Sequence, residues 1–285
     1  MIVFRLVNYY NTMLYGELLD LRLTERGAVR ILVVEVKYLM HGGFVEIRYA
    51  AAGFLCGLVF LGSIGSGAAS ADAGPYPAMA PFERYLERST SDEIALARSA
   101  APASISANAE VLTLGRAGYE TAVKGSNGFV CLVERSWANA FGDSEFWNPK
   151  LRSPICHNRA AARAVLPGYI ERTGWVLSGV SISEMMARTR AELSANTLAL
   201  PEAGAMSYMM SKQAHLKDAV GHWQPHLMFY LANTEAAAWG ANLDGSPVFA
   251  DGSTIFARED TPEPVTTFFV PIAKWSDGTP STKEH

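Results

Sequence analysis

One apolar run decides how much of this chain can belong to a folded domain. Ala50–Ile64 contains fifteen residues and no charge. A membrane-spanning helix needs about 20 apolar residues, so this run is short for an anchor but has the length of a signal-peptide core. Arg48 precedes it, and the small residues Ala69-Ser70-Ala71 follow in the A-x-A pattern that signal peptidase cleaves. We therefore expect residues 50–71 to be a signal-peptide core and cleavage region, with cleavage before Asp72.

Residues 1–49 place charged and apolar segments ahead of this signal, which makes an unusually long leader. Two explanations stay open. Either translation starts at Met40 or a nearby codon, which we favour, or the leader is extended. An uncleaved anchor is the alternative to cleavage. We expect a periplasmic or extracellular protein that keeps no stable membrane span once the signal is removed, and we exclude residues 1–71 from the fold.

Composition predicts that the remaining chain folds. The sequence has 285 residues, of which 49% are hydrophobic and 18% charged. Its formal net charge is −4 and it has no long basic run, which argues against a nucleic-acid partner. We expect residues 72–104 to form a lead-in with a short helix, and residues 105–285 to form a single domain, since a chain of this size can bury one core.

Two cysteines, Cys131 and Cys156, lie after the signal region. Thiols that pair outside the cytoplasm oxidise and stay oxidised. We therefore expect a disulfide between them, which would stabilise the fold by roughly 3 kcal/mol in the chain-entropy model. Two buried free thiols are one alternative, and a thiolate nucleophile or metal ligand is another. Cys156 and His157 are adjacent, but neighbours on an extended strand point to opposite faces and form no catalytic pair.

Capping residues and a proline predict three helices. Ser89–Glu93 opens a short helix to about Arg98, because Ser and Asp side chains accept hydrogen bonds from the first free amides of a helix. Arg159–Tyr169 is rich in alanine, and Pro167 should kink or end this helix. Ser181–Glu184 fits a capping box and opens a helix over residues 185–194.

The strand signals are short apolar or alternating runs. The predicted strands are 110–114, 119–124, 129–133, 206–211, 226–231, 247–250 and 265–272. The turn signal Gly125–Gly128 predicts that 119–124 and 129–133 pair as a β-hairpin. Trp137–Asn158 contains two proline dipeptides and is predicted to be a loop that the disulfide pins to the sheet. Because helices and strands do not alternate regularly, we expect an α+β fold, a mainly antiparallel sheet with a few packed helices.

The segment Gly221–Tyr230 carries the clearest candidate site residues. His222 and His226 are four residues apart, which on a helix places both rings on one face. Pro225 disfavours a helix there, and on an extended strand the two α-carbons would lie about 13 Å apart. A shared zinc or copper ion would therefore need a turn through Trp223. Two structural histidines, or one histidine acting alone as an acid–base group or ligand donor, are the other interpretations.

A second strand-like segment, Ala205–Gln213, is rich in methionine. The simplest interpretation is a core strand, because methionine commonly fills gaps in a core. The other is a copper(I) site, since thioether and imidazole groups both suit that ion. The residues of that site would be Met206, Met209, Met210, Met228 and the two histidines.

Four segments together resemble a group of exported bacterial proteins with no assigned function. They are Asn127–Cys131 (NGFVC), Pro154–Cys156 (PIC), Met206–Met209 (MSYM) and Gly221–Tyr230 (GHWQPHLMFY). The likeness covers most of residues 105–275. It implies a single exported domain in which the two cysteines and the two histidines belong together, and it implies no activity and no catalytic residues.

The standard catalytic motifs are absent. The chain has no G-x-S-x-G, no S-x-x-K at the candidate serines, no phosphate loop and no H-E-x-x-H. We therefore expect an exported domain that binds an unknown small molecule in a cleft lined by Tyr208, His222, Trp223 and His226. The alternatives are a hydrolase with His222 or His226 as general base, a transition-metal protein, and a structural envelope protein. Whether the chain is an enzyme stays open.

Overall fold

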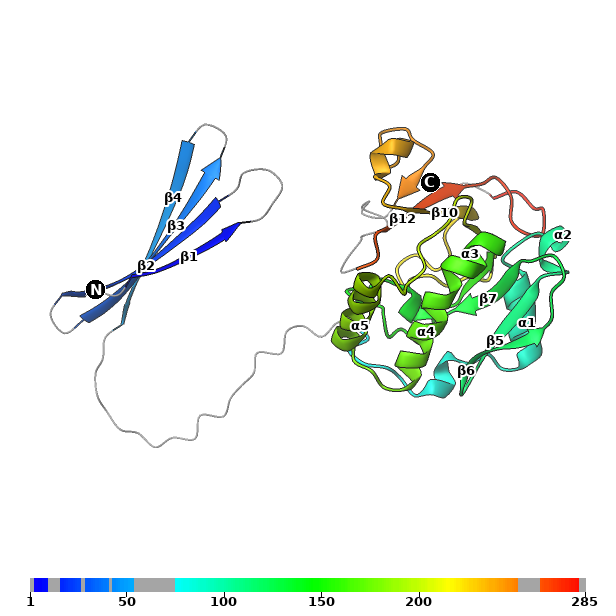
Figure 1. The fold of residues 1–285 in the computed structure, drawn as a ribbon. Helices are drawn as coiled ribbons and strands as arrows, with labels where there is room; N and C mark the ends of the chain where they lie inside the picture. Colours follow the sequence, from blue (N-terminus) through cyan, green and yellow to red (C-terminus); the bar gives the residue numbers. More distant parts are fainter. Residues whose placement is uncertain are drawn as a thin grey trace. The chain divides into compact units, whose positions relative to one another are not determined.

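The computed structural model describes residues 75–250 and 262–281 in full, and the backbone of four strands nearer the N-terminus (Figure 1). The chain divides into two compact units, Met1–Ala69 and Ser70–His285. In the first unit the strands are β1 Val3–Tyr9, β2 Gly16–Arg26, β3 Val29–Met40 and β4 Gly43–Gly53, which pair antiparallel in this order.

We expected residues 1–49 to be a leader outside the fold, and the structure gives strands there. Most of the apolar run, residues 54–64, and the Ala69–Ala71 motif lie outside the described residues. The signal peptide and its cleavage therefore stay predictions.

The second unit holds the α+β body. Its elements, in chain order, are η1 Phe82–Tyr85, α1 Thr90–Arg98, α2 Ala103–Ser106, β5 Glu110–Gly115, β6 Gly118–Val123, β7 Val130–Glu134, η2 Ser136–Ala138, β8 Ser153–His157, α3 Arg159–Ala164, α4 Leu166–Leu177, α5 Ile182–Ala195, β9 Met206–Met209, β10 His226–Ala232, η3 Ala236–Trp239, β11 Phe249–Ala250 and β12 Val265–Pro271. Among the described residues, no helix combines the length and the apolar character that crossing a membrane requires.

The described strands of this unit form one sheet in the order β11-β12-β10-β9-β8-β7-β5-β6. Every neighbouring pair is antiparallel except β5 and β7. The predicted α+β class with a mainly antiparallel sheet is confirmed.

Local signals placed the starts of α1, α3 and α5 correctly, whereas α4 continues to Leu177, beyond the predicted end at Tyr169. Ser89 caps α1 by accepting a hydrogen bond from the Asp92 amide (3.1 Å), and Ser181 caps α5 by accepting one from the Glu184 amide (3.2 Å). Pro167 lies in the first turn of α4, just after the break that ends α3. A proline is tolerated there because the first amides of a helix have no partner within it.

The predicted hairpin between 119–124 and 129–133 is wrong. β6 pairs with β5, and β7 lies on the other side of β5, parallel to it. The connection passes tightly over the start of β5, where Glu110 N donates to Phe129 O at 2.9 Å. A Cβ at Gly125 would lie 2.1 Å from the Glu110 backbone nitrogen, so only glycine fits the crossing.

The predicted loop Trp137–Asn158 is also wrong in part, because it contains β8. This strand lies between β7 and β9, and all five of its residues are buried. Pro154 is its second residue, close to the strand end, where the missing backbone donor is tolerated. The disulfide therefore joins two strands of the sheet and does not pin a loop to it.

Helices cover both faces of the sheet (Figure 1). The face that packs against α1 is called here the disulfide face, and the buried core between this face and the helix consists of Ala97, Ala100, Ala101, Ala109, Val111, Cys131, Val133 and Cys156. The face that packs against α4 and α5 is called the histidine face, and the buried core between this face and the helices includes Leu132, Ile155, Tyr169, Val176 and Met185. The alternation of side chains along β7 and β8 assigns each residue to one face.

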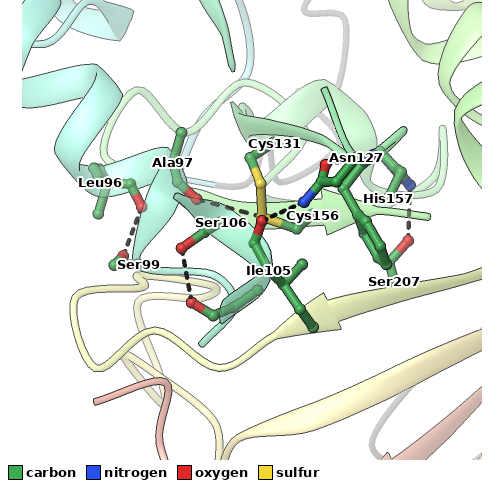
Figure 2. The surroundings of a disulfide bond; sticks show 12 residues. Leu96, Ala97, Ser99, Ile105, Ser106, Asn127, Cys131, Cys156, His157 and Ser207 are labelled. Atoms are coloured by element: carbon green, nitrogen blue, oxygen red, sulfur yellow. Dashed lines mark hydrogen bonds between the residues drawn. A yellow bond between two sulfur atoms is a disulfide. The ribbon is translucent and has the colours of Figure 1, made fainter. Parts of the chain in front are cut away.

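The Cys131–Cys156 disulfide confirms the predicted pairing (Figure 2). The two residues are directly opposite each other in the register of β7 and β8, their α-carbons are 4.0 Å apart, and both are fully buried. Arg135, the residue that follows β7, also holds α1 on the sheet. Its Nη2 forms a buried ion pair with Glu93 Oε1 of α1 at 2.9 Å. Removing one partner of such a pair costs about 3–5 kcal/mol, so this contact fixes α1 on the sheet.

Candidate functional site

The structure separates the four residues of the predicted cleft. Tyr208 pairs with Cys156 in the sheet, so its side chain lies on the disulfide face, where its ring contacts that of Phe129 at 6.2 Å. His226 pairs with Met209, one residue further along β9, and therefore lies on the opposite, histidine face. Tyr208 and His226 do not line one hollow.

The two histidines of the predicted metal pair also point to different partners. His222 is exposed and its ring contacts Trp275 edge-on at 5.3 Å. His226 is buried, and its Nδ1 lies 2.8 Å from the Gln224 carbonyl. Within residues 75–250 and 262–281, no group of three or more His, Cys, Asp or Glu is placed to hold a metal ion.

His226 and Trp223, two residues of the predicted cleft, do lie together. Their ring centroids are 4.6 Å apart, and Trp223 also meets Phe249 at 5.9 Å and Phe269 at 6.4 Å. These separations are typical of packed aromatic pairs. Burial lowers the pKa of His226 to about 4, which keeps its ring neutral near pH 7. This cluster packs the β10–β12 end of the sheet.

A buried polar row on the histidine face was not predicted. His157 ends β8 and Ser207 lies opposite it on β9, and the Ser207 hydroxyl is 2.7 Å from His157 Nδ1 (Figure 2). The Tyr230 hydroxyl on β10 donates to Ser207 Oγ at 3.1 Å. His157 and Ser207 are both fully buried. Three neighbouring strands thus contribute one hydrogen-bonded row.

The hydrogen bonds of this row favour one tautomer of the His157 ring. Because Ser207 Oγ accepts from Tyr230, its own proton can be donated to His157 Nδ1. Burial lowers the pKa of His157 to about 3, so the ring is neutral near pH 7, and a Ser207 hydroxyl that donates to Nδ1 puts the single ring proton on Nε2. Ser207 therefore orients the ring, and the Nε2–H group is the donor that His157 presents.

His157 Nε2 has no hydrogen-bond partner among the described residues, although it is buried. The nearest carboxylate oxygen, Glu134 Oε1, lies 3.9 Å away, which is too far for a hydrogen bond. Leaving a buried donor without a partner costs about 1–3 kcal/mol. Such an atom in a native fold calls for a specific explanation, such as a ligand or an ordered water.

Glu134, at the end of β7, is the second unusual group. Burial raises its pKa from 4.5 to about 8, against the lowering effect of the nearby Arg172 guanidinium. Its side chain is 13% exposed, so the carboxyl group lies at the border between the interior and solvent. Arg172 itself is engaged elsewhere, since it donates to Glu263 Oε1 at 2.9 Å and to the backbone carbonyls of Trp137 and Asn139.

The geometry therefore offers a neutral donor, His157 Nε2–H, facing a carboxyl group that titrates near neutral pH. The sequence carried only weak signals for either residue. Glu134 follows an apolar strand, and His157 falls in a segment whose prolines favoured a loop. Their closeness depends on the pairing of β7 with β8, which no local pattern encodes.

Searches against models of protein families, against curated proteins and against solved structures found no match to this chain.

We expect the buried Glu134 to make the protein less stable as the pH rises. The folded state keeps the Glu134 proton up to about pH 8, whereas the unfolded chain releases it near pH 4.5. This stabilising contribution is complete below pH 4.5 and is lost as the pH rises through 8. Glu134→Gln removes this titration. The unfolding free energy of the variant, relative to that of the wild type, should therefore increase as the pH rises from 5 to 9.

Urea unfolding of both proteins across that pH range measures the difference. The lowered pKa of His157 makes its own contribution to stability change between about pH 3 and 6.5, but both proteins carry His157, so this contribution cancels in their difference. Parallel pH profiles for wild type and Glu134→Gln would mean that Glu134 ionises as freely in the fold as in the unfolded chain.

Proposed function

We propose that this protein is an exported domain that binds a small molecule, and that His157 and Glu134 contact the bound molecule. The observation that carries the proposal is the buried Nε2–H of His157, which has no hydrogen-bond partner among the described residues and faces Glu134 at 3.9 Å. A ligand that accepts from this group would recover the free energy lost by its burial.

A binding protein is a better interpretation of this site than a hydrolase. Ser207 and His157 have the spacing of a nucleophile and its base, but both side chains are fully buried, and Ser207 lies in the middle of the sheet. A serine nucleophile must be reached by its substrate. The short contact is better explained as the bond that holds the His157 ring in place, as an orienting residue does in many binding sites.

A thermal-shift screen of small metabolites tests the binding. A ligand at 100 times its dissociation constant stabilises the folded state by about 2.7 kcal/mol and raises the melting temperature. We expect compounds that stabilise the wild type to lose their effect on His157→Phe, measured against that variant's own ligand-free melting temperature. His222→Phe is the matched control, because His222 is exposed and contacts Trp275 instead.

Equal shifts for wild type and His157→Phe would place the binding elsewhere. A screen in which no compound stabilises the wild type would contradict the proposal as well. Glu134→Leu serves as the second variant if His157→Phe does not fold.

The export part of the proposal has separate support. The uncharged Ala50–Ile64 run and the A-x-A motif that ends at Ala71 suit a cleaved signal. The Cys131–Cys156 disulfide suits an oxidising compartment.

Mass spectrometry of the protein secreted by a bacterial host should give a mature N-terminus at Asp72. Replacing Ala71 with arginine should leave the precursor uncut, because signal peptidase needs a small residue at that position. A mature N-terminus upstream of residue 50 would refute the assignment.

A further inference from the structure

We propose that a groove between the segment Pro75–Pro81 and the α4–α5 turn binds the alkyl chain of a carboxylate, with the carboxylate group at Arg116. The segment is called here the strap, and it passes the end of α4 and the start of α5 (Figure 1). Neither His157 nor Glu134 lines the groove, so this site is separate from the one proposed above. Its shape, its apolar walls and its charge carry the inference.

The groove consists of two adjoining hollows of about 350 and 410 Å³. They adjoin because Met79, Val176 and Gly179 line both, and together they follow the chain from Pro77 to Phe82. Each hollow has the volume of a small-molecule pocket, roughly 300–1,000 Å³. A methionine side chain has three rotatable bonds, so a small movement of Met79 would join the two hollows. A Cβ added at Gly179 would contact nothing within 4 Å, so the turn leaves space beside them.

The strap is attached near its ends. The Tyr76 hydroxyl donates to Asp218 Oδ2, and the Ala80 amide donates to the Tyr85 hydroxyl at 3.2 Å. Within the described part of the chain, the backbone of Pro77–Met79 makes no hydrogen bond. Backbone that lacks hydrogen bonds moves at low free-energy cost. The middle of the strap can therefore shift to admit a chain while both ends stay attached.

The walls of the groove are mainly apolar. Six aliphatic or aromatic side chains contribute to them, namely Met79, Phe82, Trp147, Leu177, Val180 and Ile182. All six are only partly buried, so a ligand that covers them removes apolar surface from water. The hydroxyl groups of Ser181 and Ser183 lie at the larger hollow. These walls suit an alkyl chain.

Arg116 is the one charged residue among the described residues that line the groove, and it lines only the smaller hollow. Gly115 pairs with Gly118, so Arg116 lies in the two-residue turn between β5 and β6. Its Nη2 donates to Glu83 Oε1 at 2.6 Å, but both side chains are largely exposed, and exposed ion pairs are weak. A guanidinium has five N–H donors, so Arg116 can also bind a ligand carboxylate. A single cation at one hollow favours an alkyl carboxylate over an alkylammonium ion.

NMR of methionine methyl groups labelled with carbon-13 tests the inference on the full chain. The probe is octanoate below the concentration at which it forms micelles, and the Met79 signal is identified by its loss in Met79→Leu. We expect octanoate to shift the Met79 signal in a saturable way. The signal of Met210 is the internal control, because the Met210 amide donates to Ala100 O on the α1 side of the sheet.

The chain and the charge of the probe are varied separately. Hexanoate has two methylene groups fewer and should bind about tenfold more weakly, because each buried methylene adds to the affinity. Octyltrimethylammonium carries the same chain with the opposite charge and should bind at least fivefold more weakly than octanoate.

Two variants that break the same ion pair should have opposite effects. Arg116→Gln removes the cation and should weaken octanoate binding about fivefold. Glu83→Gln removes the competing carboxylate and should strengthen it about twofold. His157→Phe should leave the octanoate response unchanged, because His157 does not line the groove.

Equal weakening by Arg116→Gln and Glu83→Gln would overturn the placement of the carboxylate at Arg116. Octyltrimethylammonium binding as tight as that of octanoate would overturn the charge selection. A Met79 signal that does not move, or that moves no more than the Met210 signal, would remove the groove as a binding site. Loss of the octanoate response in His157→Phe would do the same. None of these results decides the proposed function, which depends on a ligand that requires His157.

Discussion

The pairing of β7 with β8 fixes the positions of both the disulfide and the candidate site residues. These strands carry the disulfide on one face and Glu134 and His157 on the other. A slip of one residue would turn every side chain to the opposite face. The Cys131–Cys156 bond forbids that slip, and closing the loop between the cysteines stabilises the fold by about 3 kcal/mol. The compartment that oxidises the cysteines would therefore also set the geometry of the candidate site.

Much of the fold could be predicted, because many of its signals are local. Ser89 and Ser181 mark helix starts by the hydrogen bonds that their side chains accept, and Pro167 marks the break between two helices. Two features could not be predicted in this way. The glycine turn at Gly125 was expected to fold β7 back on β6, yet it carries the chain across β5. The strand β8 was missed because Pro154 suggested a loop.

The candidate site depended still more on long-range pairing. Proximity in sequence drew attention to His222 and His226, but one is exposed near Trp275 and the other is packed on Trp223. The adjacency of Cys156 and His157 was correctly set aside as a catalytic pair, since the two side chains take opposite faces. The sequence could not show that His157 lies 3.9 Å from Glu134. In the register of the two strands His157 is paired with Val130, and Glu134 lies further along β7.

The candidate site depends on a neutral His157 ring that Ser207 holds in one orientation facing Glu134. Nitrogen-15 NMR of the imidazole ring at pH 6, with the His157 signal identified by its loss in His157→Phe, tests this most directly. The structure predicts an uncharged ring with its proton on Nε2 and a hydrogen-bonded, unprotonated Nδ1. A charged ring at that pH, or a proton on Nδ1, would contradict this assignment of the His157 proton.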